Sequence, residues 1–424
     1  MLSLKFIQEN KEKVIEGLAV KNFDASGIIE IVTLLDNQRK QTQSSLDNTL
    51  AEINNISRNI GILIKSNKTG EAESARKQTT ELKEKSKELG QRISEIENEL
   101  HNTLIQIPNI PHSTVPAGKG SAGNLIVREG GVIPRLEDGS LAHWDIAKKY
   151  NIIDFELGNK LTGSGFPVYK GKGARLQRSL ISFFLDEAVS AGYSEVIPPL
   201  LVNEDSGFGT GQLPDKEGQM YYVCLDNFYL IPTAEVPVTN IYRDVILSAA
   251  EFPVKTTAYT PCFRREAGSY GKDVRGLNRL HQFDKVEIVV IEHPDRSYIA
   301  LENMVNHVEN LVQKLGLAYR IVKLCGGDMS FTSAMTYDFE VYSAGQDKWL
   351  EVSSVSNFES FQANRLKLRF KDEGEKKTRL AHTLNGSALA LPRIVAALLE
   401  NNQTSKGIII PRCLIPYTGF EIID

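Results

Sequence analysis

Positively charged side chains are concentrated in one part of this sequence. Six lysine and arginine residues but only two acidic residues lie between positions 255 and 280. The stretch FRREAGSYGKDVRGLNRLHQF (263–283) holds most of them, including Lys272, Arg275 and Arg279, and it ends at Phe283. A solvated surface usually carries less charge of one sign, and a triphosphate or an RNA backbone would account for the excess. Phe283 has two open interpretations, a stacking partner for a base or an ordinary core aromatic.

Other segments carry polar side chains that suit phosphate chemistry. Glu351 and Ser354 lie three residues apart in EVSSVSNF (351–358), and such hard oxygen ligands suit a Mg²⁺ ion that bridges phosphates. In NGSALALPR (385–393) a polar turn precedes an expected helix over 387–403, which carries Arg393. A further segment, GYSEVIPPLL (192–201), is expected to lead from a helix end into a strand through two prolines.

The composition excludes several classes of protein. The net charge is only -4, with 41% hydrophobic and 24% charged residues, which is typical of a globular protein and argues against a generally basic nucleic-acid coat. We expect no signal peptide and no membrane span. The four cysteines form no C-x-x-C pair, and the seven histidines form no paired ligand motif. We therefore expect reduced thiols, a cytoplasmic location and no zinc site.

The elements that would position these residues fall into two unlike regions. Residues 28–105 contain no proline and no aromatic residue, and their apolar residues recur every three or four positions: Leu46, Leu50, Ile53, Ile56, Ile60, Ile64, Leu82, Leu89, Ile93, Ile96, Leu100 and Leu104. This spacing predicts two long antiparallel helices in a coiled-coil arm, joined by a turn over 66–73 in which Gly70 caps or bends the chain. The arm has two open interpretations: a spacer or dimerisation rod, or a probe that reaches a distant part of a large ligand.

Prolines, glycines and serines mark a linker at about 106–124, which divides residues 1–110 from residues 111–424. In the second region short β-type runs, at 286–292, 338–343 and 407–415, are mixed with helical stretches, at 174–192 and 387–403. They do not alternate regularly, and no Rossmann or Walker glycine motif follows a strand. We therefore predict an α+β domain with a mainly antiparallel β-sheet flanked by helices.

Taken in order, the segments resemble the three signature motifs of class II aminoacyl-tRNA synthetases. The proline turn at 192–201 resembles motif 1, FRREAG (263–268) resembles motif 2, and GSALALPR (386–393) resembles motif 3. More narrowly, PTAEVPVTN (232–240), TRLAHTLNGSALA (378–390) and the helical arm before PNIPH (108–112) resemble bacterial-type seryl-tRNA synthetase. The resemblance covers essentially the whole chain and implies the class II catalytic fold.

The resemblance also implies site residues. Arg264 would hold the α-phosphate of ATP and Arg393 the γ-phosphate side, as the catalytic residues, while Phe283 would stack on adenine. Glu351 and Ser354 would be the Mg²⁺ ligands. The full ATP-binding set would be Arg264, Arg265, Glu266, Leu280, His281, Gln282, Phe283, Glu351, Val352, Ser353, Ser354 and Arg393. The L-serine pocket would comprise Thr233, Ala234, Glu235, Arg264, Glu287, Asn385 and Ser387.

The implied function is that of a homodimeric serine–tRNA ligase. It would activate L-serine with ATP and transfer it to tRNA(Ser), held by the N-terminal arm, and also to tRNA(Sec). One alternative is a synthetase-like amino acid:carrier-protein ligase, against which the long arm argues. Another is a non-catalytic coiled-coil interaction protein, against which Arg264, Arg393 and the Glu351–Ser354 pair argue.

Overall fold

The computed structural model describes residues 1–266 and 275–424, so Lys272 of the basic stretch lies outside the described residues. The chain forms two compact units. The first comprises Met1–Ala19 and Phe23–Pro108, and the second comprises Val20–Asn22 and Asn109–Asp424. Among the described residues, no helix combines the length and the apolar character that crossing a membrane requires.

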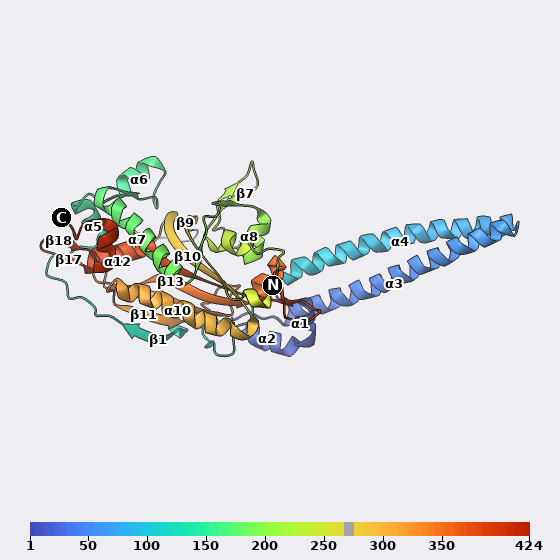
Figure 1. Cartoon of the computed structure of the whole chain (residues 1–424). Helices are drawn as coiled ribbons and strands as arrows, with labels where there is room; N and C mark the ends of the chain where they lie inside the picture. Colours follow the sequence, from blue (N-terminus) through green and yellow to red (C-terminus); the bar gives the residue numbers. More distant parts are fainter. Residues whose placement is uncertain (267–274) are drawn as a thin grey trace. The chain divides into compact units, whose positions relative to one another are not determined.

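The first unit is helical, with α1 (Leu4–Glu9), α2 (Lys11–Ala19), α3 (Ser26–Lys65) and α4 (Thr69–Leu104). The two long helices α3 and α4 lie side by side as a hairpin (Figure 1), which confirms the predicted antiparallel arm. Their seam buries Ile53, Ile93 and Ile96, as the periodicity indicated. Leu50 and Ile64, by contrast, are 44% and 48% exposed, so the seam buries fewer of the periodic apolar residues than the sequence predicted.

The turn between the long helices differs from the prediction. Only Ser66, Asn67 and Lys68 are non-helical, and Gly70 lies inside the first turn of α4. Asn67 has the positive φ angle, 50°, that reverses the chain direction. Asparagine is one of the few residues apart from glycine that readily adopts this left-handed conformation, so it takes the position expected for Gly70.

The second unit is built on an eight-stranded sheet in the order β1-β11-β12-β13-β16-β10-β9-β4. All neighbouring strands are antiparallel except the short pair β4 and β9, which confirms the mainly antiparallel prediction. The bounds are β1 (Leu125–Gly130), β4 (Ser194–Glu195), β9 (Val254–Phe263), β10 (Gln282–Glu292), β11 (Tyr319–Lys323), β12 (Met335–Ser343), β13 (Lys348–Glu359) and β16 (His382–Ala390).

Helices cover one face of this sheet. These are α7 (Gly171–Ser190), α10 (Ser297–Lys314) and α12 (Leu391–Asn401), shown in Figure 1, while α5 (His143–Lys149) packs on α12. Val286, Ile288 and Val290 of β10 project from this face into the main core, where the helices pack on them. Side chains alternate between the two faces of a strand, so Lys285 and Glu287 project from the opposite face. That opposite face forms the candidate site.

Smaller elements surround the sheet. The strands are β2 (Ile153–Asp154), β3 (Val168–Tyr169), β5 (Leu201–Val202), β6 (Tyr222–Val223), β7 (Phe228–Leu230), β8 (Ile246–Ser248), β14 (Arg369–Lys371), β15 (Arg379–Leu380), β17 (Gln403–Thr404), β18 (Gly407–Ile409) and β19 (Ile422–Ile423). The helices are α6 (Phe155–Leu161), α8 (Glu204–Thr210), α9 (Glu235–Asn240), α11 (Ser360–Leu366) and α13 (Ile415–Thr418).

Two predicted elements have the wrong boundaries. The helix expected over 387–403 begins only at Leu391, and residues 387–390 are the end of β16, hydrogen-bonded within the sheet. Pro392, in the first helical turn, marks the true start, a position where proline is well tolerated. The strand expected over 407–415 ends at Ile409, and a 3₁₀ turn and α13 follow it.

Candidate active site

A polar cavity of about 690 Å³ opens on the opposite face of the sheet, on which α9 and α11 also pack. The register of the strands creates it, because alternate residues on neighbouring strands point to the same side. Ser387 lies opposite Glu287, Ser356 lies opposite Asn385, and Asp338 lies opposite Ser354. Four strands, β12, β13, β16 and β10, thus give the cavity a floor of hydroxyl, amide and carboxylate groups.

Most of the predicted site residues line this cavity: Thr233, Glu235, Arg264, Glu266, Leu280, Phe283, Glu287, Glu351, Val352, Ser353, Ser354, Asn385, Ser387 and Arg393. Four others lie outside the lining. Ala234 is fully buried and Gln282 is exposed. Arg265 contacts Gln219 through its backbone N–H, and His281 bonds to Tyr221 and stacks on Phe166. The structure thus brings most of the predicted ATP-binding residues and most of the predicted serine-binding residues into one cavity.

A buried ion pair lies in the cavity between Lys285 and Glu287, which are 5% and 2% exposed. Lys285 Nζ lies 2.5 Å from Glu287 Oε2 and donates to Thr233 Oγ1 at 2.8 Å. The Thr233 hydroxyl in turn donates to Glu287 Oε2 at 3.1 Å. Lys285 was not among the predicted site residues, although its alternation with Phe283 and Glu287 on one strand was the available signal.

A second buried carboxylate, Glu235, lies at the start of α9 beside this pair. Its Oε1 accepts a 2.6 Å hydrogen bond from Gln362 Nε2, and its backbone N–H donates to Thr233 Oγ1. Burial and then the nearby charge of Glu287 raise the pKa of Glu235 from 4.5 to about 7. The pocket floor therefore holds two carboxylates and one ammonium group, which suits a ligand that carries its own positive charge.

Two arginines lie at the wall of the cavity. The Arg264 guanidinium lies 5.3 Å from the centre of the Phe283 ring, and its Nε donates to Pro232 O. Arg393 donates to Glu351 O at 2.6 Å and, through Nε, to Asn278 O at 3.1 Å. Both guanidinium groups are thus held by backbone carbonyls, an arrangement that fixes their direction before an anionic ligand binds.

The basic stretch is less available to a ligand than its charge suggested. Arg264 and Arg279 line the cavity, and Arg279 is ion-paired with Glu266 at 3.0 Å. Arg275 packs over the Trp144 ring at 4.4 Å, and Lys255 packs over the Tyr193 ring at 5.3 Å. Part of the predicted phosphate-binding charge therefore supports the fold, because a cation over an aromatic face is itself a stabilising contact.

Oxygen groups at the mouth of the cavity could hold a metal ion. Glu351 is half exposed, Ser354 lies nearby on β13, and Asp338 Oδ1 is buried in the cavity wall without a hydrogen-bond partner. Burial and then the Glu351 charge raise the pKa of Asp338 well above its usual range. The described residues contain no cluster of three or more acidic, histidine or cysteine ligands. Any divalent ion would therefore depend on ligand oxygens as well, as Mg²⁺ commonly does. Sequence analysis missed Asp338, which only the strand register places here.

Comparisons with known proteins agree with this geometry. A family model described as the seryl-tRNA synthetase N-terminal domain matches residues 1–111. A second, described as the tRNA synthetase class II core domain (G, H, P, S and T), matches residues 223–402. Together they span the helical unit and most of the sheet that carries the cavity.

Individual relatives match over their full length. A serine–tRNA ligase from Salinibacter ruber is 48% identical, with 100% of this chain and 99% of the relative covered. A serine–tRNA ligase from Thermodesulfovibrio yellowstonii is 45% identical, with both chains fully covered. The crystal structure of seryl-tRNA synthetase from Pyrococcus horikoshii complexed with ATP is 33% identical, with a TM-score of 0.93 over 100% of this chain and 99% of that one.

The raised pKa of Glu235 has a measurable consequence for stability. Between about pH 4.5 and pH 7 the unfolded chain has lost a proton that the folded chain keeps, so this residue lowers the free energy of unfolding as the pH rises. Glu235→Gln cannot titrate. The difference in the free energy of unfolding, variant minus wild type, should therefore rise by about 1–3 kcal/mol over this window and level off above pH 7.

Urea unfolding at pH 5, 6, 7 and 8 measures this difference. Glu375→Gln, at an exposed carboxylate, is the control and should show no such rise. A difference for Glu235→Gln that stays constant between pH 5 and pH 8 would show that this carboxylate has an ordinary pKa.

Proposed function

The chain belongs to the seryl-tRNA synthetases, which are class II aminoacyl-tRNA synthetases, and we propose that it uses ATP to join L-serine to tRNA(Ser). One observation carries this proposal. A single cavity combines buried carboxylates, Glu235 and Glu287, with two arginines, Arg264 and Arg393. The acidic floor suits the ammonium and hydroxyl groups of serine, and the arginine wall suits the phosphates of ATP.

In the first step the serine carboxylate attacks the α-phosphate of ATP, and pyrophosphate leaves as seryl-adenylate forms. The attacking carboxylate is already ionised at neutral pH, so this step needs no general base. The roles of the protein are to align the two substrates and to stabilise charge on the phosphates, through Arg264 and Arg393. In the second step a ribose hydroxyl at the 3′ end of the tRNA takes the seryl group and releases AMP.

The buried pocket accounts for the choice of serine. Alanine lacks the serine hydroxyl, so it would leave the carboxylate of Glu287 without that hydrogen bond in a site from which water is largely excluded. Sites of this kind discriminate by about 10⁴ or more. Lys285 and Thr233 hold Glu287 in place, and Asn385 and Ser387 close the pocket on the neighbouring strand.

Mg²⁺ fits the oxygen groups at the mouth of the cavity. We assign Glu351 and Ser354 as its protein ligands, supported by the unpartnered Asp338 Oδ1 beside them. When bound, the ion would neutralise phosphate charge as pyrophosphate leaves. Arg393 contacts the Glu351 carbonyl and lies 3.7 Å from its carboxylate, so this arginine links the metal ligand to the phosphate-binding wall.

The helical arm is proposed to bind tRNA. Beyond its base, where α3 contacts α1 and α2, the long hairpin of α3 and α4 buries mainly its own seam, and its outer surface is largely polar with charges of both signs. RNA helices are recognised largely through backbone and shape, which suits contact with the long variable arm of tRNA(Ser). We extend this proposal to tRNA(Sec) and to a cytoplasmic site of action, on the basis of the family alone. An amino acid:carrier-protein ligase remains the second candidate function, because its first step would be the same.

Replacement of residues 30–103 by a short linker separates these functions. The cavity lies entirely in the second unit, so serine-dependent pyrophosphate exchange should stay within about threefold of wild type. Charging of tRNA(Ser), and of tRNA(Sec) where it occurs, should fall by at least about a hundredfold, because a large sequence-independent contact is lost. Both half-reactions are measured, with a thermal melt as the folding control. Normal charging by the shortened protein would contradict the role of the arm. A full-length protein that catalyses exchange but charges no tRNA would favour the carrier-protein ligase.

The motif 1 region is proposed to form a homodimer interface. Ile197, beside the two prolines, is 90% exposed, and Val189 and Leu201 are 47% and 44% exposed. These three exposed apolar side chains are close in sequence, and large exposed apolar patches commonly mark an interface. We expect sedimentation equilibrium at micromolar concentration to give twice the chain mass of 47.2 kDa. Ile197→Asp should shift the measured mass toward that of one chain. A wild-type protein that sediments as a single chain would overturn the proposal.

A further inference from the structure

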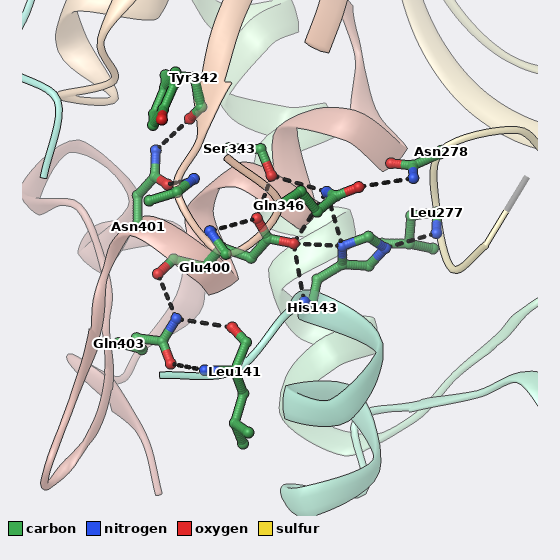
Figure 2. A network of polar contacts seen from close by, with 12 residues as sticks. Leu141, His143, Leu277, Asn278, Tyr342, Ser343, Gln346, Glu400, Asn401 and Gln403 are labelled. Carbon is green, nitrogen blue, oxygen red and sulfur yellow. Dashed lines mark hydrogen bonds and ion pairs between the residues drawn. The ribbon is translucent and has the colours of Figure 1, made fainter. Parts of the chain in front are cut away.

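A buried polar network connects α5, α12 and the loop segment that contains Leu277 and Asn278 (Figure 2). At its centre is Glu400, in the last turn of α12, whose side chain is fully buried. Its two oxygens accept hydrogen bonds from five groups: the His143 backbone N–H, His143 Nδ1, Ser343 Oγ, the Gly345 backbone N–H and Gln346 Nε2. Burial alone would raise the pKa of Glu400, but the bonds from His143 and Ser343 lower it below its usual value. The carboxylate is therefore a fully satisfied anion.

The partners of His143 define its tautomer. Nδ1 lies 2.7 Å from the Glu400 carboxylate, which can only accept, so Nδ1 carries the proton. Nε2 accepts the backbone N–H of Leu277 at 2.8 Å, so Nε2 carries none. The ring is thus a neutral connector with one donor and one acceptor, both used. Gly276 makes this close approach possible, because a Cβ atom there would lie 2.2 Å from Nε2 and the backbone φ angle is +70°.

The segment held in this way forms part of the active-site wall. Leu277 and Asn278 both line the cavity, and the Asn278 carbonyl accepts the bond from Arg393 Nε. The Asn278 side chain donates to Gln346 Oε1 at 2.9 Å, so Gln346 connects it back to Glu400. On α5, Trp144 adds a second attachment by packing against Arg275. The loop segment thus has attachments on both sides of residue 277.

Arg393 and Glu400 lie on the same helix, seven residues apart, which is two helical turns. Arg393 contacts the segment directly through the Asn278 carbonyl, and Glu400 holds it through His143. A movement of residues 276–278 would therefore change the direction of the Arg393 guanidinium. The network lies outside the cavity lining itself, apart from Leu277 and Asn278.

We propose that His143 and Glu400 are positioning residues for ATP: through Leu277 and Asn278 they fix the wall segment and the orientation of Arg393. This inference rests on the proposed function, because it takes Arg393 as a phosphate contact. The proposal makes ATP binding depend on α5, although none of the described residues of α5 lines the cavity. A network that only stabilised the core would affect unfolding but would leave the relative affinities for ATP and serine unchanged.

A matched pair of substitutions separates these two roles. The amide of His143→Asn can take the place of Nδ1 and keep the bond to Glu400, but it leaves the Leu277 N–H without an acceptor. The longer side chain of His143→Gln can reach the Nε2 position and restore that acceptor. We expect His143→Asn to raise the KM for ATP in serine-dependent pyrophosphate exchange about tenfold, the factor for one lost hydrogen bond. The KM for serine should stay within about twofold of wild type, and His143→Gln should recover most of the ATP effect.

His307→Asn is the control, since this ring on α10 packs on Tyr193, outside the network. It should leave both KM values unchanged. Equal changes in both KM values for His143→Asn, or a lower melting temperature without a change in the KM for ATP, would overturn the proposal. If His143→Asn does not fold, the same KM values are measured for Gln346→Met, at a half-buried position. A raised KM for ATP alone would support the proposal, and unchanged KM values would overturn it. Failure of wild-type exchange would instead count against the proposed function.

Discussion

The ion pair between Lys285 and Glu287 is the interaction on which the rest of the site depends. Two carboxylates, Glu235 and Glu287, are buried close together, and without a counter-charge both could not remain ionised. Lys285 supplies one positive charge, and the raised pKa of Glu235 lets that residue keep its proton near neutral pH. The incoming ammonium group of serine would supply the second charge. Binding of serine would then neutralise the negative charge that Lys285 alone does not balance.

The antiparallel sheet makes this arrangement possible. Neighbouring strands place Glu287 opposite Ser387, and Ser354 opposite Asp338, so polar residues from distant parts of the chain share one face. The other face of the same strands is apolar and packs on the helices. Such a face is rigid, and its groups can be directed at a ligand without reorganisation when the reaction occurs. Groups that do not lie on these strands need separate supports, which the backbone carbonyls of Pro232 and Asn278 give to Arg264 and Arg393.

The sequence predicted those features that depend on local spacing. Apolar periodicity predicted the hairpin arm, the irregular mixture of strand and helix segments predicted the mainly antiparallel sheet, and the family resemblance supplied most of the residues that line the cavity. Features set by contacts between distant residues were missed. Lys285 and Asp338 enter the site only through the strand register, and His143 meets Leu277 across 134 positions. Residues 387–390 were assigned to a helix because their side chains fit either structure, and pairing with β10 decides the outcome.

The central claim, that a buried carboxylate recognises the serine hydroxyl, is tested most directly by comparing serine with alanine. The measurement is kcat/KM for each amino acid in ATP–pyrophosphate exchange, for wild type and Glu287→Gln. We expect wild type to prefer serine by about 10⁴, and the variant to lose at least about tenfold of that preference, mainly through slower use of serine. An unchanged ratio in a folded variant would contradict the account, because it would place the discrimination elsewhere in the pocket.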